Sequence, residues 1–91
     1  MEERVIVLDR VPQRHPEVSK EDAAAAWNHC LACAPALGCG PDRHIAIGID
    51  DKGRQLELLV IRKGAGLWLV AHAQCPPQRG IRAGFGSGRG M

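Results

Sequence analysis

The sequence predicts an α+β fold, in which a small antiparallel β-meander of three or four strands has one main helix packed on one face and a short C-terminal helix. Three observations lead to this class. Apolar residues alternate with a period of two from Arg43 to Ala73, glycine-containing turns divide that stretch, and a capped amphipathic segment precedes it. We expect a single domain over residues 1–83 and a glycine-rich flexible tail over residues 84–91, where glycine recurs at every second position up to Gly90.

The chain begins with a short apolar run. Val5 to Leu8 would form an edge strand or an extended arm, because Val11-Pro12 interrupts the run. A residue that precedes proline avoids helical geometry. His15, which precedes Pro16, should therefore lie in an extended or turn conformation just outside a helix.

The main helix is expected from Lys20 to about Cys33. Ser19 can cap it while Asp22 reaches back in a capping box, and Pro35 should stop it. A buried stripe follows the helical i, i+3, i+4, i+7 spacing. Its members are Ala23, Ala26, Trp27, Cys30, Leu31 and Ala34.

Three strands should follow. The first carries isoleucines at period two, and the Asp50–Gly53 sequence then supplies a reversal in which Gly53 can adopt a positive φ. The second strand is apolar on both faces, which predicts a central position. In the third strand, Leu67, Leu69 and Ala71 alternate with Trp68, Val70 and His72. The alternation predicts that His72 shares the face of Trp68 and Val70.

Beyond the meander, Pro77 can open a short helix from Gln78 to about Ala83. This helix would carry Arg79 and Arg82 on one side, because residues three apart are neighbours on a helix surface.

Composition sets broad limits on function. No apolar run reaches the roughly 20 residues of a membrane helix, and the first residues do not resemble a signal peptide, so we expect a cytoplasmic protein with no membrane contact. The net charge is +2, and nine of the twelve basic residues are arginine. A planar guanidinium binds anionic oxygen pairs well, so this preference favours a phosphate-containing partner.

The four cysteines allow two interpretations. Cys30, Cys33, Cys39 and Cys75, with His29 and His72, contain enough sulfur and imidazole for a zinc site, and a small zinc-binding module stays open as an alternative. Cys30 and Cys33 fall on the predicted helix, however, which is unlike the knuckles of structural zinc sites. We therefore expect reduced structural cysteines, and neither a metal nor another cofactor.

Histidines and arginines fall at the ends of the predicted elements. His15, His44 and His72, with Arg14, Arg43, Arg62, Arg79 and Arg82, could form a basic cleft for a phosphodiester. The arginines would hold the developing charge while an imidazole moves a proton. No carboxylate cluster suited to a divalent metal appears, so cleavage would use the 2′-hydroxyl of RNA as the nucleophile.

Four segments resemble BrnT-like toxins of the RelE and ParE superfamily, which belong to type II toxin–antitoxin modules. They are Arg14-His15-Pro16 through Ala23, Arg43-His44-Ile45-Ala46-Ile47-Gly48, Gly53-Arg54-Gln55-Leu56, and Trp68 through Ala73. The resemblance implies an antiparallel sheet with packed helices, metal-independent RNA cleavage, and neutralisation by a cognate DNA-binding antitoxin.

The resemblance also implies site residues. His15, His72 and Arg79 would be catalytic, and Arg14, Arg43 and Arg82 would bind the substrate. Two segments depart from the family pattern, because the C-terminal basic helix is shorter and Ala71-His72-Ala73-Gln74 replaces a serine-arginine patch. A catalytically silent relative that only binds nucleic acid or protein therefore stays an alternative, as does association of exposed sheet rims into a homodimer.

Overall fold

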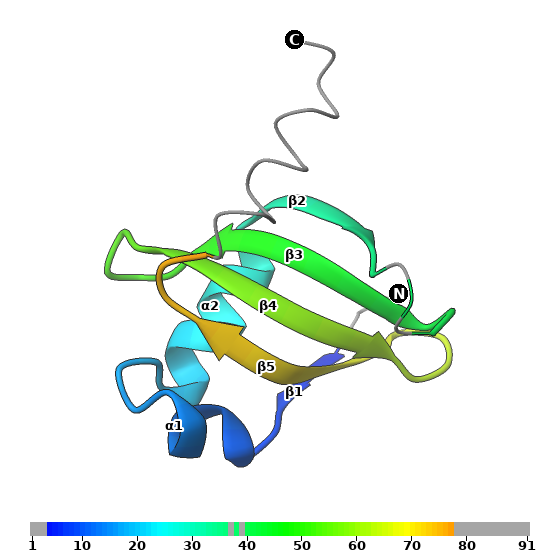
Figure 1. Ribbon diagram of the computed structural model, residues 1–91, viewed down its shortest axis with the longest axis horizontal. Helices are drawn as coiled ribbons and strands as arrows, with labels where there is room; N and C mark the ends of the chain where they lie inside the picture. Colours follow the sequence, from blue (N-terminus) through cyan, green and yellow to red (C-terminus); the bar gives the residue numbers. More distant parts are fainter. Residues whose placement is uncertain (1–3, 37, 39, 78–91) are drawn as a thin grey trace, which may run out of the picture.

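The computed structural model describes residues 4–36, 38 and 40–77, which form one five-stranded mixed sheet (Figure 1). The strands are β1 (Arg4–Val7), β2 (Cys30–Pro35), β3 (Arg43–Ile49), β4 (Gln55–Arg62) and β5 (Leu67–Gln74). Their order across the sheet is β1-β5-β4-β3-β2. β1 runs parallel to β5, and the other three pairings are antiparallel.

Two short helices lie on one face of this sheet. α1 (Arg10–Arg14) packs on β5, and α2 (Lys20–Asn28) packs mainly on β3 and passes behind the sheet in Figure 1. None of the helices in the described residues is long and apolar enough to cross a membrane. We call the sheet face opposite these helices the open face, because no described helix packs on it.

The predicted α+β class with a main helix is wrong. Helices account for only five and nine residues, and the sheet has five strands with one parallel pair instead of a three- or four-stranded antiparallel meander. The protein is a small β-rich fold. The expected C-terminal helix, Gln78 to Ala83, lies outside the described residues, as does the tail over 84–91.

The largest local error concerns the segment after Asn28. α2 begins at Lys20 with the predicted capping box between Ser19 and Asp22, but Cys30–Pro35 forms β2 on the outer edge of β3. Leu31, which was expected to be buried, is 61% exposed. A longer helix would have left the backbone groups along the outer edge of β3 unpaired, and this tertiary pairing outweighs the helical spacing of small residues.

The antiparallel meander of β3, β4 and β5 is confirmed, as is the central position of β4. Gly53 has φ +80° in the reversal between β3 and β4, as its turn requires. The Asp50 carboxylate organises that turn, because Oδ1 accepts hydrogen bonds from the amides of Lys52 and Arg54 at 3.0 and 2.8 Å.

β1 is an edge strand, which is one of the two roles expected for the run from Val5 to Leu8. It leads directly into α1, a helix that the sequence did not predict. Pro12 fits within the first turn of α1, where backbone amides have no partner inside the helix. His15 follows α1 with φ −132° and ψ 81°, outside helical geometry as expected.

The core lies between the helices and the sheet. Its largest fully buried side chains are Leu56, Leu58, Val11, Val18, Val60 and Val70. At Gly48 the backbone of β3 approaches α2 so closely that a Cβ would overlap the carbonyl oxygen of Ala26. This contact requires glycine at position 48.

A β-bulge in β5 determines where His72 lies. Leu59 of β4 pairs with His72, but the next residue, Val60, pairs with Val70, so Ala71 is an extra residue without a partner in β4. The predicted placement of His72 on the face of Trp68 and Val70 is therefore wrong. The bulge moves His72 to the open face, because one inserted residue reverses the alternation of side chains.

Candidate functional site

A candidate site lies where α1 meets the end of β5. β1 pairs only with the first half of β5, from Leu67 to Val70, so no strand flanks the outer edge of β5 beyond that point in the described part of the chain. α1 packs against β5 and occupies this edge. The short helix therefore brings its side chains beside the bulge at Ala71.

Arg10 links the helix to the bulge. Its Nε donates a hydrogen bond of 3.0 Å to the carbonyl oxygen of Ala71, the residue that the β4 pairing leaves out. Arg14 lies one helical turn further on, on the same side of α1. Arg14 makes no hydrogen bond or ion pair with any residue that the structure describes, so its guanidinium can bind an anion.

His15 and His72 are in direct contact. Their ring centroids lie 5.2 Å apart, and the rings meet edge to face with an angle of 85° between their planes. Glu17 Oε2 lies 3.4 Å from His15 Nδ1, and Gln74 Oε1 lies 3.1 Å from His72 Nε2. A partner at one ring nitrogen orients each imidazole and leaves the other nitrogen to exchange a proton.

A pocket of about 220 Å³ opens between His72 and the two arginines of α1. Its described lining consists of Arg10, Arg14, Leu59, Ala71 and His72. The volume is below the roughly 300 to 1,000 Å³ of sites for drug-sized molecules. A pocket of this size with two guanidiniums suits a phosphate group better than a large organic ligand.

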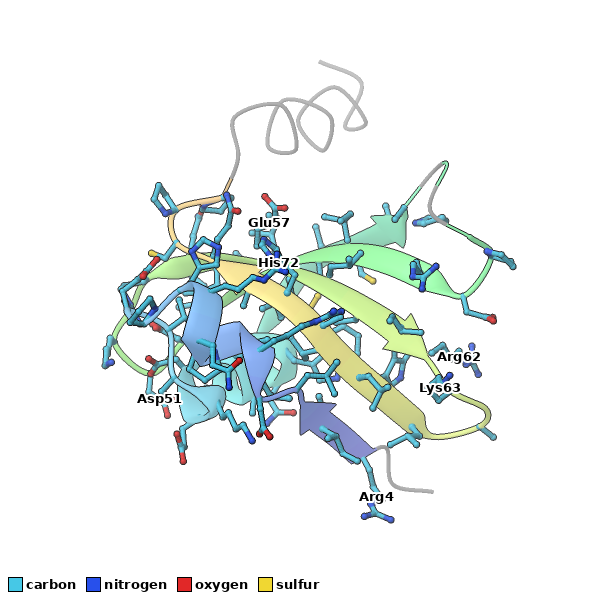
Figure 2. The ribbon with its side chains drawn as sticks, turned by 60° about the horizontal axis from the view of Figure 1, so that its bottom comes forward. Arg4, Asp51, Glu57, Arg62, Lys63 and His72 are labelled. Carbon is cyan, nitrogen blue, oxygen red and sulfur yellow. The ribbon has the colours of Figure 1, made fainter. Side chains whose placement is uncertain are left out.

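Glu57 adds a carboxylate next to His72. Glu57 pairs with Gln74 across β4 and β5, while His72 pairs with Leu59, so the two residues are diagonal neighbours on the open face. Figure 2 shows both side chains on the same part of the sheet. Glu57 is only 5% exposed. A buried carboxylate beside an imidazole could orient the ring or receive its proton.

The structure unites some predicted site residues and separates others. Arg14 and His72 line the pocket, and His15 contacts the His72 ring. Arg43 lies on the open face but two strands from His72, a separation of roughly 12 Å from strand spacing and rise. Arg79 and Arg82 lie outside the described residues.

His44 was expected in the cleft but lies on the opposite side of the sheet. It packs edge-on against Trp68, at 5.4 Å between ring centroids, on the face that the helices cover. Its Nδ1 is buried without a hydrogen-bond partner in the part of the chain that the structure describes. His44 therefore belongs to the aromatic packing around Trp68 and not to the pocket.

Two residues of the site escaped the sequence analysis. Arg10 falls between the elements that the sequence predicts, and Glu57 lies on the second predicted strand, where alternation alone gives it no role. The i, i+4 spacing of Arg10 and Arg14 was the available signal for Arg10, although it required recognition of a five-residue helix. The position of Glu57 becomes informative only once the register between β4 and β5 is known.

The three described cysteines, Cys30, Cys33 and Cys75, do not gather into a zinc site, and Cys39 lies outside the described residues. Among the described residues no group of three or more histidine, cysteine, aspartate or glutamate side chains could hold a metal ion. Cys30 and Cys33 are exposed free thiols on β2, and Cys75 packs against the core. Partial burial raises the pKa of both Cys30 and Cys33, which disfavours the thiolate form that metals bind.

The comparisons with known proteins return no relative. No family model matches the chain, and no match is found among curated proteins or solved structures.

Proposed function

We propose that this protein is a ribonuclease toxin of a type II toxin–antitoxin module that cleaves RNA without a metal ion. The contact between His15 and His72, beside the arginines of the pocket, is the observation that carries the proposal. The BrnT-like segments of the sequence support it further, because both residues of this contact, His15 and His72, lie within them.

The groups of the pocket match the needs of RNA cleavage through the 2′-hydroxyl. One imidazole removes the proton of the 2′-hydroxyl as its oxygen attacks the adjacent phosphorus, and the other protonates the departing 5′-oxygen. The bond from phosphorus to the 2′-oxygen forms, the bond to the 5′-oxygen breaks, and a 2′,3′-cyclic phosphate remains.

The arginines supply the electrostatic part of this chemistry. Negative charge accumulates on the non-bridging phosphate oxygens in the transition state, and guanidiniums fixed beside them stabilise it. Arg10 is fixed by its bond to Ala71, while Arg14 is available to the substrate. In this proposal the protein acts in the cytoplasm, and a cognate DNA-binding antitoxin neutralises it by covering the pocket.

A second candidate is a silent relative that binds a phosphate without cleaving it. One nitrogen of each imidazole already has a polar neighbour, Glu17 for His15 and Gln74 for His72. If those contacts persist when the substrate is bound, and if they hold the imidazoles in tautomers that cannot transfer the proton, the pocket would bind RNA without cleaving it.

The test uses purified protein and RNA in excess EDTA. We expect cleavage that leaves a 2′,3′-cyclic phosphate, and no cleavage at a position where the nucleotide 5′ to the scissile phosphate is 2′-deoxy. Loss of cleavage in EDTA, or equal cleavage of the deoxy-substituted substrate, would contradict the proposal. Binding without cleavage at any pH would favour the silent relative.

A further inference from the structure

Four exposed cations form a row across the end of the sheet that lies furthest from the pocket. We call this row the basic rim; it consists of Arg4, Arg43, Arg62 and Lys63. Backbone contacts align them. Arg4 pairs with Leu67, whose carbonyl accepts a hydrogen bond of 2.8 Å from the Lys63 amide. The Arg62 amide donates a bond of 2.8 Å to the carbonyl of Asp42, the residue before Arg43.

The rim and the pocket lie at opposite ends of the same strand. β5 starts at Leu67, beside the rim, and reaches His72 after the bulge. Figure 2 shows Arg4, Arg62 and Lys63 well separated from His72. A rise of about 3.3 Å per residue places the two ends roughly 15 Å apart. A single nucleic-acid strand could therefore contact both.

The charges of the rim are presented to solvent. All four residues are exposed. Arg4 and Arg43 lie on the open face by register, whereas the Arg62 guanidinium lies 5.7 Å from the centre of the Trp68 ring on the helix-covered face, a cation–π contact that restricts its position. Within the described part of the chain, Asp42 is the acidic residue next in sequence to a member of the rim, while Glu2 and Glu3, which precede Arg4, lie outside it. The open-face residues of β4 and β5 between the rim and His72 are uncharged, namely Leu59, Ile61, Leu67 and Leu69. These two strands therefore carry no carboxylate on the open face between the rim and His72, and Glu57 lies beyond His72 on β4.

We propose that the basic rim binds backbone phosphates of the RNA strand whose scissile phosphate occupies the pocket. This inference rests on the proposed function and adds to it a second, sequence-independent contact with the substrate. Each phosphate contact releases condensed counterions, so it contributes about 0.7 to the slope of log affinity against log salt for a single strand. The rim thus predicts a salt dependence that the pocket alone does not produce.

The test measures binding of a fully 2′-O-methylated RNA, which cannot be cleaved, by fluorescence anisotropy between about 50 and 200 mM salt. Lys63→Gln and Arg4→Gln each remove one rim charge. Lys20→Gln is the control for the loss of one positive charge, because Lys20 is exposed, pairs with Asp9, and belongs neither to the rim nor to the described lining of the pocket. We expect each rim variant to reduce the slope by about 0.7. The control should leave the slope unchanged.

The length of the oligonucleotide gives an independent measure. Lys63→Gln should weaken binding of an RNA of about ten nucleotides severalfold but leave an RNA of about two nucleotides unaffected, because only the longer strand reaches the rim. Equal slopes in Lys63→Gln and Lys20→Gln would overturn the inference. Failure of the wild-type protein to bind RNA would also overturn it and would leave an acidic protein surface as the ligand of the rim. Rim-dependent binding without cleavage would support the rim and refute the ribonuclease proposal.

Discussion

Arg54 Nη2 lies 3.0 Å from Asp22 Oδ2, and this ion pair joins the hairpin between β3 and β4 to the first turn of α2. The same guanidinium group lies 2.8 Å from Asp50 Oδ2 within the turn. Asp22 and Asp50 are both buried. Hairpin and helix are therefore fixed to each other by a charged cluster at the edge of the core, in addition to their apolar packing.

Removing the Asp50 carboxylate should destabilise the protein strongly. Asp50→Asn replaces an acceptor that receives bonds from two backbone amides and from Arg54 Nε, and it leaves a partly buried guanidinium with less compensation. Because Arg54 is 28% exposed, water limits the cost, and we expect a loss of about 2–3 kcal/mol in the free energy of unfolding. Urea denaturation measures it. Asp51→Asn, at the exposed neighbouring position, is the control and should change stability by less than about 0.5 kcal/mol.

Stability should fall in acid because of this cluster. Burial alone would raise the pKa of Asp22 and Asp50, but hydrogen bonds from Ser19 and Lys52 to Asp22, and from Arg54 and Lys52 to Asp50, outweigh it and lower both values. A carboxyl group with a lowered folded-state pKa contributes its full stabilisation above the unfolded value of about 3.9 and loses it as the pH falls through the folded-state pKa.

The measurement is the urea midpoint from about pH 7 down to about pH 2. It should be nearly constant above about pH 5 and drop steeply below about pH 4. Asp50→Asn should show a shallower acid loss, since one of the linked protons is gone. Parallel curves for the variant and the wild type would show that Asp50 does not contribute to the acid transition.

Gly48→Ala should be among the most damaging small substitutions. The added Cβ would overlap the Ala26 carbonyl oxygen, so the backbone of α2 must move away from β3. We expect a loss of about 3 kcal/mol, from thermal or urea unfolding. Gly53→Asn is the comparison. Gly53 has φ +80°, and a Cβ added there would meet no atom within 4 Å. Asparagine tolerates that conformation, so we expect this substitution to cost about 1 kcal/mol or less. A Gly48→Ala protein as stable as Gly53→Asn would refute the close contact.

Arg10→Lys tests how the bulge is held. Lysine keeps the charge but has no Nε to donate to Ala71, so we expect faster amide exchange around His72 and roughly tenfold slower RNA cleavage, since His72 follows Ala71 directly. Global stability should change by about 1 kcal/mol. Gln13→Ala, an exposed substitution on the same helix, should leave exchange and cleavage unchanged. Unaltered exchange at His72 in Arg10→Lys would mean that the bulge does not depend on Arg10.

The parts of the fold that the sequence predicted have strong local signals. The meander follows from sustained alternation, and the start of α2 follows from the capping box of Ser19 and Asp22. The parts that it missed depend on distant partners. Cys30–Pro35 is short and rich in small residues, so pairing with β3 determined its structure. α1 is too short to produce a recognisable period.

The site was predictable only in part for the same reason. Alternation along β5 placed His72 on the wrong face, because nothing in the local sequence marks Ala71 as a bulge. His15 and Arg14 were identified from their types and from the BrnT-like resemblance, but their proximity to His72 arises because α1 replaces β1 along the edge of β5. Such an arrangement follows from the topology of the whole sheet and not from any single segment.

The most direct test of the proposed mechanism is the single-turnover rate of RNA cleavage in EDTA for the wild type, His15→Ala and His72→Ala. Two imidazoles acting as acid and base predict a bell-shaped dependence of the rate on pH, with each variant at least about 100-fold slower and lacking one limb of the bell. Both variants should still bind 2′-O-methylated RNA, because the arginines remain. Wild-type rates in either variant, with the bell intact, would contradict a catalytic role for the histidine pair.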